Sequence, residues 1–328
     1  MQTILIGNVK IKKTACLAPM ASVADRAYRT LCMEYGAAYC VGEMASSNAL
    51  CYSDRKTAHL LASSLEEQPM AVQLFGNSPD NMARAAELAC AFHPQVIDVN
   101  MGCPVPKVTG NGCGSALMKT PELAYAIIKA MTNATDIPIT VKIRKGFDES
   151  NVNAPEFAKR MQDAGAAAIT IHGRTRQQMY RPPVDLSVIK AVKDSVDIPV
   201  IGNGGVTCGR EAKEMYDRTG CDLVMIGQGS YGRPWVFKEI KHFLETGESL
   251  PEPPLEERLD VMLRHVSMMV ENDGEKLGMM EARKHAAWYI KGSKGAAAFR
   301  HACGQLRTYS DLKILVERVK AEQKREEK

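Results

Sequence analysis

The stretch from residue 137 to residue 229 decides the fold, because four short apolar runs recur in it between amphipathic segments. The runs are IPITVKIR (137–144), AAAITIHG (166–173), IPVIGNGG (198–205) and CDLVMIGQG (221–229). The intervening PEFAKRMQDAG (155–165) has the apolar spacing of a helix. Strands that alternate with helices predict right-handed crossovers and a parallel sheet.

Four similar runs precede this stretch in the chain. They are TACLAPM (14–20), AAYCVGEM (37–44), PMAVQLFG (69–76) and QVIDVNMG (95–102). Eight strand–helix repeats close a (β/α)8 TIM barrel, which takes about 250 residues. An open, doubly wound sheet is the structural alternative, but the count of eight and the similar spacing favour the barrel. We therefore predict an α/β fold with a (β/α)8 barrel over residues 1–245.

The pattern changes after residue 245. TGESLPEPPLEE is rich in proline and glycine, which predicts a linker over 246–256. Residues 257–328 contain helical patterns without strand signals, so we predict a C-terminal helical bundle domain there. Between Glu281 and Arg307 the chain has six Lys or Arg residues and one acidic residue. This local excess indicates a polyanionic partner.

The bulk composition is that of a water-soluble globular chain, with 45% hydrophobic and 24% charged residues. Its apolar runs are shorter than the ~18 residues of a membrane span. The N-terminal MQTILIGNVKIKK lacks the apolar core of a signal peptide. We expect a cytoplasmic protein, in which the ten cysteines, none in a C-x-x-C pair, are reduced thiols.

Polar residues or glycines mark the carboxyl end of all eight predicted strands. Such residues are candidates for a working site, because barrel enzymes build their active sites at this rim. The set is Met20, Glu43, Gln73, Asn100, Cys103, Lys142, Arg144, His172, Asn203 and Gly227.

The glycine-rich GNGG (202–205) and GQGS (227–230) follow the last two predicted strands. Barrels commonly bind a phosphate at this place, and the phosphate of FMN would fit there. Residues 227–232 also match G-x-G-x-x-G, the signature of a dinucleotide-binding fold. That fold would need a further strand and an acidic residue about 20 positions on. A helical pattern and the linker follow instead, so the match is weak.

Two polar side chains suit the polar edge of a flavin ring. The Gln73 amide could hydrogen-bond the pyrimidine part, and Lys142 could stabilise negative charge on the reduced ring. The alternatives are structural: Lys142 could extend along the barrel to solvent, and His172 could be a hydrogen-bonded core histidine.

Several motifs together resemble one known family. They are DVNMGCPVPKV (98–108), GSALM (114–118), LAPMASVADRAYR (17–29), VKIRKGF (141–147), IHGRTR (171–176), IGNGGV (201–206), GRPWVF (232–237) and ARKHAAWYIKG (282–292). In this order the sequence resembles the tRNA-dihydrouridine synthase family, and its bacterial B-type branch most. The resemblance runs from about residue 4 to about residue 310.

The resemblance implies an FMN-dependent reduction of the C5–C6 double bond of uridines in tRNA. Reduced flavin would deliver hydride to C6, and an acid would protonate C5. Cys103 matches the family's catalytic cysteine; a thiol suits this task, because it stays largely protonated near neutral pH yet ionises readily. The alternative for Cys103 is a small apolar residue before a proline. NADPH is the family's usual donor, with NADH open, and we expect a monomer.

The resemblance also assigns binding residues. Those expected to bind FMN are Pro19, Met20, Ala21, Gln73, Lys142, His172, Asn203, Gly204, Gly205, Gly227 and Gln228. Those expected to bind the uridine are Asn100, Arg144, Arg174 and Tyr180. Arg144 and Arg174 could alternatively be ordinary surface cations. No metal site is expected.

Two residues depart from the family pattern. Gln228 stands where arginine is common, so a charged contact to the flavin phosphate would be missing. Cys113 lies ten residues after Cys103, at a position that is not usually cysteine. Cys113 is either a bystander or a partner that forms a disulfide with Cys103 on oxidation.

A uridine in folded RNA must leave its stack to enter a deep barrel. The cations of the helical domain, above all Arg283 and Lys284, are expected to hold the RNA phosphates. The alternatives are a solvated helix face for these charges and a bundle core for Trp288. Two other functions stay open: an FMN barrel enzyme acting on a free small molecule, and a non-catalytic RNA-binding protein.

Overall fold

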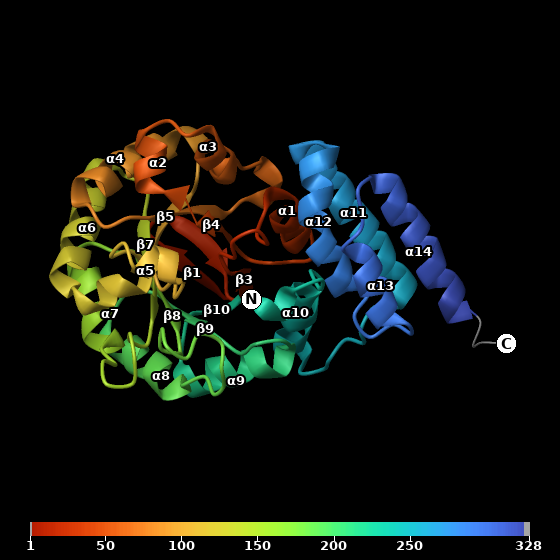
Figure 1. Cartoon of the computed structure of the whole chain (residues 1–328). Helices are drawn as coiled ribbons and strands as arrows, with labels where there is room; N and C mark the ends of the chain where they lie inside the picture. The colour runs from red at the N-terminus through yellow and green to blue at the C-terminus, as the bar shows by residue number, and fades with distance from the viewer. Residues whose placement is uncertain (1, 325–328) are drawn as a thin grey trace.

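Eight parallel strands form a closed barrel in the computed structural model, which describes residues 2–324 (Figure 1). The strands are β3 (Ala15–Leu17), β4 (Cys40–Ser46), β5 (Met70–Phe75), β6 (Val96–Met101), β7 (Ile139–Arg144), β8 (Ala168–His172), β9 (Val200–Asn203) and β10 (Leu223–Ile226). The barrel closes where β10 pairs with β3, with Val224 opposite Ala15. Each strand overlaps one of the eight predicted runs, which confirms the predicted fold class.

Helices surround the barrel. They are α1 (Arg26–Glu34), α2 (Ser47–Cys51), α3 (Arg55–Leu61), α4 (Pro79–Ala89), α5 (Pro106–Thr109), α6 (Pro121–Ala134), α7 (Ala154–Asp163), α8 (Leu186–Ser195), α9 (Gly209–Thr219) and α10 (Val236–Thr246). Short 3-10 turns lie between them: η1 (Leu65–Glu67), η2 (Cys90–Phe92), η3 (Gly114–Lys119) and η4 (Gln228–Ser230). Proline in the first turn of α4, α6 and α7 favours their starts, because its missing N–H has no partner there anyway.

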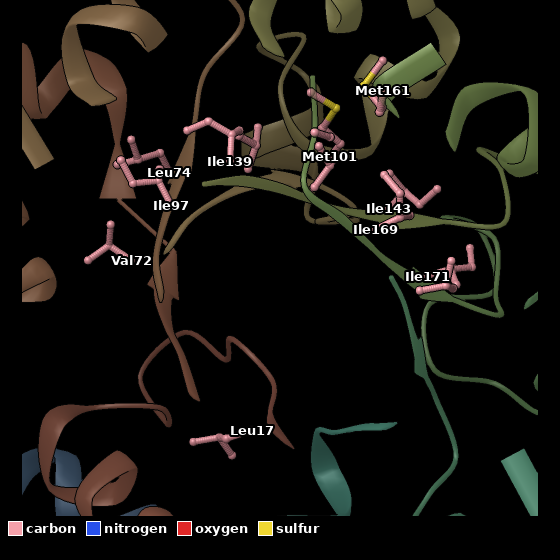
Figure 2. Packing of buried hydrophobic residues seen from close by; sticks show 14 of the residues in the cluster. Leu17, Val72, Leu74, Ile97, Met101, Ile139, Ile143, Met161, Ile169 and Ile171 are labelled. Carbon is pink, nitrogen blue, oxygen red and sulfur yellow. The ribbon is translucent and has the colours of Figure 1, made fainter. Parts of the chain in front are cut away.

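Side chains alternate along each strand, and this alternation creates the site. On β6, Ile97, Val99 and Met101 belong to the apolar layer between strands and helices, which Figure 2 shows. The residues between them, Asp98 and Asn100, therefore face the barrel interior. The same period of two on the neighbouring strands turns Thr140, Lys142 and His172 inwards.

A two-stranded hairpin closes the opposite end of the barrel. It pairs β1 (Thr3–Ile6) with β2 (Val9–Lys12) in antiparallel register. Ile6 and Ile11 are fully buried in one cluster with residues of the barrel's interior, such as Tyr39. This hairpin is not among the predicted elements, although Gly7-Asn8 between two alternating runs is a hairpin signal.

Four further helices form a bundle beside the barrel (Figure 1). They are α11 (Leu255–Asp273), α12 (Glu275–Tyr289), α13 (Ala296–Cys303) and α14 (Tyr309–Lys324). They share an apolar cluster of their own, which also takes in Ala27 of α1 and Trp235 before α10. The helical bundle is confirmed, while the domain boundaries stay predictions. Among the described residues, no helix is both long and apolar enough to cross a membrane.

Candidate active site

A cavity of about 330 Å³ lies at the carboxyl end of the barrel. Its size falls in the range of small-molecule sites. All the residues predicted to bind cofactor line it: Pro19, Met20, Ala21, Gln73, Lys142, His172, Asn203, Gly204, Gly205, Gly227 and Gln228. Cys103 lines it as well, together with the predicted uridine-binding residues Asn100, Arg144, Arg174 and Tyr180.

Arg283 and Lys284 do not line this cavity, because they lie on α12 in the helical bundle. The Nε of Arg283 donates to the backbone oxygen of Leu306 at 2.9 Å. The ammonium of Lys284 pairs with Glu281 one helical turn earlier. Both side chains are half-buried and occupied, so any contact with RNA has to share them with these partners.

A chain of hydrogen bonds connects the interior of the barrel to Cys103. Asp98 accepts from Thr140 at 2.6 Å and from the Gln73 amide at 2.6 Å. The Gln73 oxygen accepts from the Asn100 amide at 2.8 Å. The Asn100 oxygen in turn accepts from the backbone N–H of Cys103 at 2.8 Å. These bonds fix the orientation of both amides and make Asn100 a positioning residue for Cys103.

The Cys103 segment is also held from its other side. The Nε of Arg144 donates to the Gly102 carbonyl at 2.7 Å. The Cys103 carbonyl accepts from the Ser115 hydroxyl at 2.9 Å. Arg144 is only 3% exposed, which argues against an ordinary surface cation. Its guanidinium also donates to the Met179 carbonyl at 2.9 Å, so it joins the Cys103 segment to the loop that carries Tyr180.

Lys142 lies beside Asn100 in the pairing of β7 with β6 and supplies a half-buried positive charge. Its ammonium donates to the Asn203 side-chain oxygen at 3.0 Å. The Asn203 amide donates to the Met225 carbonyl at 2.9 Å, which orients that oxygen towards Lys142. Burial, reinforced by Arg144, lowers the pKa of Lys142 to about 8. The side chain lines the cavity and is held by the hydrogen bond to Asn203, so the alternative of a lysine that extends along the barrel to solvent does not apply.

His172 faces the same space. Burial lowers its pKa well below the ordinary value, and the charges of Lys142, Arg144 and Arg174 act in the same direction. The imidazole is therefore neutral and can either donate or accept a hydrogen bond. Its Nε2 lies 3.3 Å from the guanidinium of Arg174.

Glycines shape the rim after β9. Gly204 has φ of +122°, and a Cβ there would lie 2.9 Å from the ring of His172. Gly205 has φ of +74°, again in the region that side chains disfavour. The G-x-G-x-x-G match directly follows β10, which pairs with β3 and completes the barrel. A dinucleotide-binding fold is therefore wrong for this segment.

Glu43 is among the residues predicted at the site, and the structure corrects this. The register of β4 against β5 shifts between Val41 and Met44. Met44 consequently lines the cavity, whereas Glu43 accepts a hydrogen bond from the Ser22 backbone N–H outside it. A bulge reverses the alternation of side chains. Gly42, an isolated glycine inside the strand at this register shift, is the sequence signal that could have indicated it.

Tyr231 lines the cavity although it is not among the predicted residues. Its ring stacks on Trp288 of α12, with centroids 4.2 Å apart and planes inclined by 16°. Trp288 packs against the barrel core, and Tyr289 is fully buried in the bundle core. Both therefore serve packing, and the bundle directly contacts a wall of the cavity.

Cys113 immediately precedes the 3-10 turn η3, and its thiol lies 3.5 Å from the Asn111 carbonyl. Cys103 and Cys113 are both free and buried. A Cβ at Gly114 would lie 3.1 Å from the Cβ of Cys103, so η3 packs directly on the Cys103 segment. The roles of bystander and oxidation partner both stay predictions.

Comparisons with known proteins agree with this geometry. The sequence model of the family described as dihydrouridine synthase matches residues 16–325. The tRNA-dihydrouridine synthase B of Vibrio vulnificus is 43% identical over 295 residues, covering 90% of this chain and 92% of that protein. The protein of the same name from Shewanella oneidensis is 41% identical over 312 residues, covering 95% and 97%. A probable tRNA-dihydrouridine synthase of Rickettsia conorii is 41% identical over 300 residues, covering 91% of each chain.

Proposed function

Because the chain belongs to the dihydrouridine synthase family, we propose that it reduces uridines of tRNA to dihydrouridine, with FMN in the barrel cavity. One observation carries the proposal: the Cys103 thiol, the half-buried Lys142 ammonium and the His172 imidazole line one cavity at the barrel's carboxyl end. We further propose NADPH as the electron donor, a monomeric state and a cytoplasmic location, where tRNA is available.

The residues of the cavity fit a flavin. FMN would supply hydride transfer when bound. Lys142 could place its positive charge near a reduced ring that gains negative charge, and the pair of glycines after β9 would leave room for a close backbone approach to a phosphate. Gln228 would offer a neutral amide to the phosphate, so the contact there would depend on backbone N–H groups.

Cys103 is the proposed proton donor to C5 of the uridine. Asn100 and Ser115 hold the Cys103 backbone, which keeps the residue at the cavity wall. Arg144 and Tyr180 lie beside each other, with the guanidinium 5.8 Å from the ring centroid. They could hold the uridine ring between the thiol and the flavin, which is the alignment that a proton transfer requires.

Replacing the thiol separates the two halves of this reaction. In Cys103→Ala, flavin binding and anaerobic reduction by NADPH are expected to stay at wild-type levels, whereas reoxidation by unmodified tRNA is lost. Removing a positioned general acid typically costs 10²–10⁴-fold in rate. The matched control is Cys113→Ala, which removes a buried thiol next to the adjacent turn and is expected to leave both halves intact.

The readouts are flavin absorbance under anaerobic conditions and the mass of the digested nucleosides, which gain two hydrogens per reduced uridine. Wild-type turnover of tRNA by Cys103→Ala would show that another group donates the proton. If NADPH reduces the flavin of the wild-type protein but tRNA does not reoxidise it, the result would favour a free small molecule as the substrate. Protein that binds tRNA without retaining flavin would favour a non-catalytic RNA-binding role.

We propose that the bundle holds the tRNA through phosphate contacts. Lys291 and Arg300 are exposed at the end of α12 and on α13, near the predicted contacts Arg283 and Lys284. Removing one phosphate interaction lowers the steepness of log affinity against log salt by roughly 0.7–0.9. Lys291→Glu with Arg300→Glu is therefore expected to weaken tRNA binding and flatten its salt dependence.

The matched control for this experiment is Lys10→Glu with Lys12→Glu. Both double variants replace two cations by two glutamates, so they change the net charge equally. Lys10 and Lys12 lie on the hairpin at the far end of the barrel, away from the bundle. Binding is measured by filter retention across a salt series. Equal losses in both double variants would mean that net charge, rather than the bundle, attracts the RNA.

A further inference from the structure

Three side chains from distant parts of the sequence meet between the barrel and the bundle. Asp25 precedes α1, His265 lies on α11 and His285 lies on α12. One oxygen or nitrogen of each lies within 4.8 Å of those of the other two. Both histidines are fully buried, and the group is separate from the cavity that holds Cys103.

The polar atoms at the centre of this group lack partners. Among the described residues, Oδ2 of Asp25, Nε2 of His265 and both ring nitrogens of His285 have no hydrogen bond. Buried polar atoms without partners are costly and rare in folded proteins, so a group that satisfies them is expected here.

We propose that Asp25, His265 and His285 bind a divalent transition-metal cation, with Zn²⁺ as the best match. Two imidazole nitrogens and one carboxylate oxygen are a common donor set for this ion. Bonds of about 2.0–2.1 Å in tetrahedral geometry place ligand atoms about 3.3 Å apart. The separation of Nε2 of His285 and Oδ2 of Asp25 is 3.6 Å, close to that value.

The donor chemistry suits a cation as the occupant. The rings of His265 and His285 are fully buried, and a neutral imidazole nitrogen offers a lone pair to a cation. A metal ion would stabilise the Asp25 carboxylate, because it supplies positive charge directly at Oδ2.

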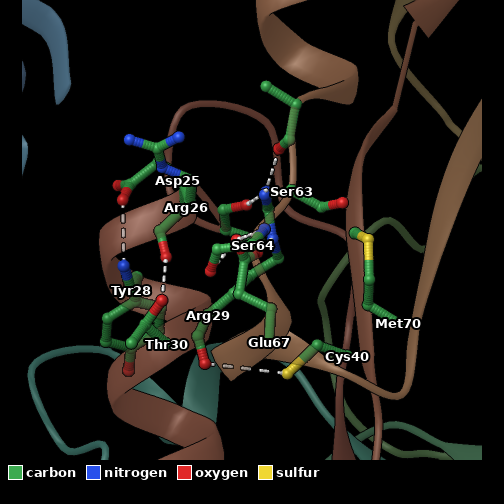
Figure 3. Close-up of polar contacts among 12 residues, drawn as sticks. Asp25, Arg26, Tyr28, Arg29, Thr30, Cys40, Ser63, Ser64, Glu67 and Met70 are labelled. Carbon is green, nitrogen blue, oxygen red and sulfur yellow. Dashed lines mark hydrogen bonds and ion pairs between the residues drawn. The ribbon is translucent and has the colours of Figure 1, made fainter. Parts of the chain in front are cut away.

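The outer contacts orient the ligands. Oδ1 of Asp25 accepts from the Tyr28 backbone N–H at 2.9 Å, which leaves Oδ2 for the cation (Figure 3). The Tyr289 hydroxyl lies 3.3 Å from Nδ1 of His265, which leaves Nε2 for the cation. The ring of Tyr28 stacks on His265 with centroids 5.2 Å apart. Asp25 and His265 thus have partners on the side away from the proposed ion, as ligands in metal sites commonly do.

A second cavity of about 180 Å³ reaches Asp25, one of the three proposed ligands. Asp25 and Ser22 line it from the barrel side, and Met269 and Glu281 line it from α11 and α12. A cation could enter there from solvent and link the barrel to both helices. The site would therefore fasten the bundle to the barrel, independently of flavin or tRNA.

The test is the metal content of the untagged wild-type protein, measured by mass spectrometry, together with its melting temperature. We expect one zinc ion per chain, a lower Tm after removal by EDTA, and recovery when Zn²⁺ is added back. Replacement by Co²⁺ should give the visible bands of a tetrahedral site without the near-ultraviolet band of a thiolate ligand, which excludes the ten cysteines.

Two variants locate the ion. Asp25→Asn keeps the cap of α1, because asparagine caps a helix as well as aspartate does; it should lose the zinc and the response of Tm to Zn²⁺. His285→Asn should do the same, while the control His301→Gln, on the exposed face of α13, should keep both. Zinc-free wild type whose Tm ignores EDTA and Zn²⁺ would overturn the proposal, as would variants that keep their zinc.

Discussion

Asn100→Ala is the sharpest test of how the barrel positions its thiol. The substitution removes the acceptor of the Cys103 N–H and the donor to the Gln73 oxygen. The side chain also accepts from the Gly102 N–H at 3.2 Å and donates to the Met44 sulfur at 3.2 Å, so four hydrogen bonds disappear. Asn100 is 7% exposed, and water from the cavity can replace these bonds only in part.

Each such bond contributes a net ~0.5–1.5 kcal/mol, and a buried group left unpaired costs more. We therefore expect the free energy of unfolding to fall by about 2–4 kcal/mol in urea titrations. The matched control is Asn77→Ala, which removes an exposed amide bonded to the Asn111 carbonyl. That variant is expected to lose less than about 1 kcal/mol.

The catalytic consequence is larger and confined to one half of the reaction. With its N–H released, Cys103 can shift, and a displacement of about 1 Å can cost ~10²-fold in rate. Stopped-flow measurements should show a wild-type rate of flavin reduction by NADPH and a strongly slowed reoxidation by tRNA. Asn100→Asp keeps the acceptor, so its rate of flavin reoxidation by tRNA should lie between those of the wild type and Asn100→Ala. Reoxidation of Asn100→Ala at the wild-type rate would refute the positioning role.

Two further predictions concern Lys142 and Gly232. With a folded pKa of about 8 against 10.5 in the unfolded chain, Lys142 holds its proton longer when unfolded, so stability should rise with pH between these values. In urea titrations of the flavin-free protein, the free energy of unfolding of the wild type should rise between about pH 7.5 and 10.5 by on the order of 1–3 kcal/mol more than that of Lys142→Met. Curves of unfolding free energy against pH that run parallel for the two proteins would contradict this prediction. Gly232→Ala adds a Cβ 2.7 Å from the Trp288 backbone at φ of +64°, and it should cost over ~2 kcal/mol. Gly247→Ala, at φ of +80° with open space, should cost only about 1 kcal/mol, and equal losses would show that the contact can yield.

The sequence was sufficient to predict the barrel because short apolar runs recur eight times, with helical patterns between them. On β6, Ile97, Val99 and Met101 alternate with polar residues, whereas β10 is apolar throughout, as buried parallel strands commonly are. The cavity followed, since the carboxyl ends of parallel strands meet at one rim.

The features of the site that the sequence did not predict correctly have a different physical origin. The bulge that moves Glu43 out of the cavity depends on how β4 registers against β5, which is a property of two strands together. The group of Asp25, His265 and His285 is also not local, because its members come from three segments that meet only in the folded chain. The pairing of Lys284 with Glu281 depends on side-chain conformations that composition does not specify.

The closure of β10 onto β3 has a consequence for synthesis on the ribosome. Partners in this closure lie far apart in the chain, as with Tyr28 and the Ser230 carbonyl, which are 202 residues apart. Until β10 has emerged, β3 and β9 expose unpaired edges, and such edges promote aggregation. A nascent chain stalled before residue 223 would therefore present an open sheet, and a chaperone that shields strand edges would act on this protein before its helical bundle exists.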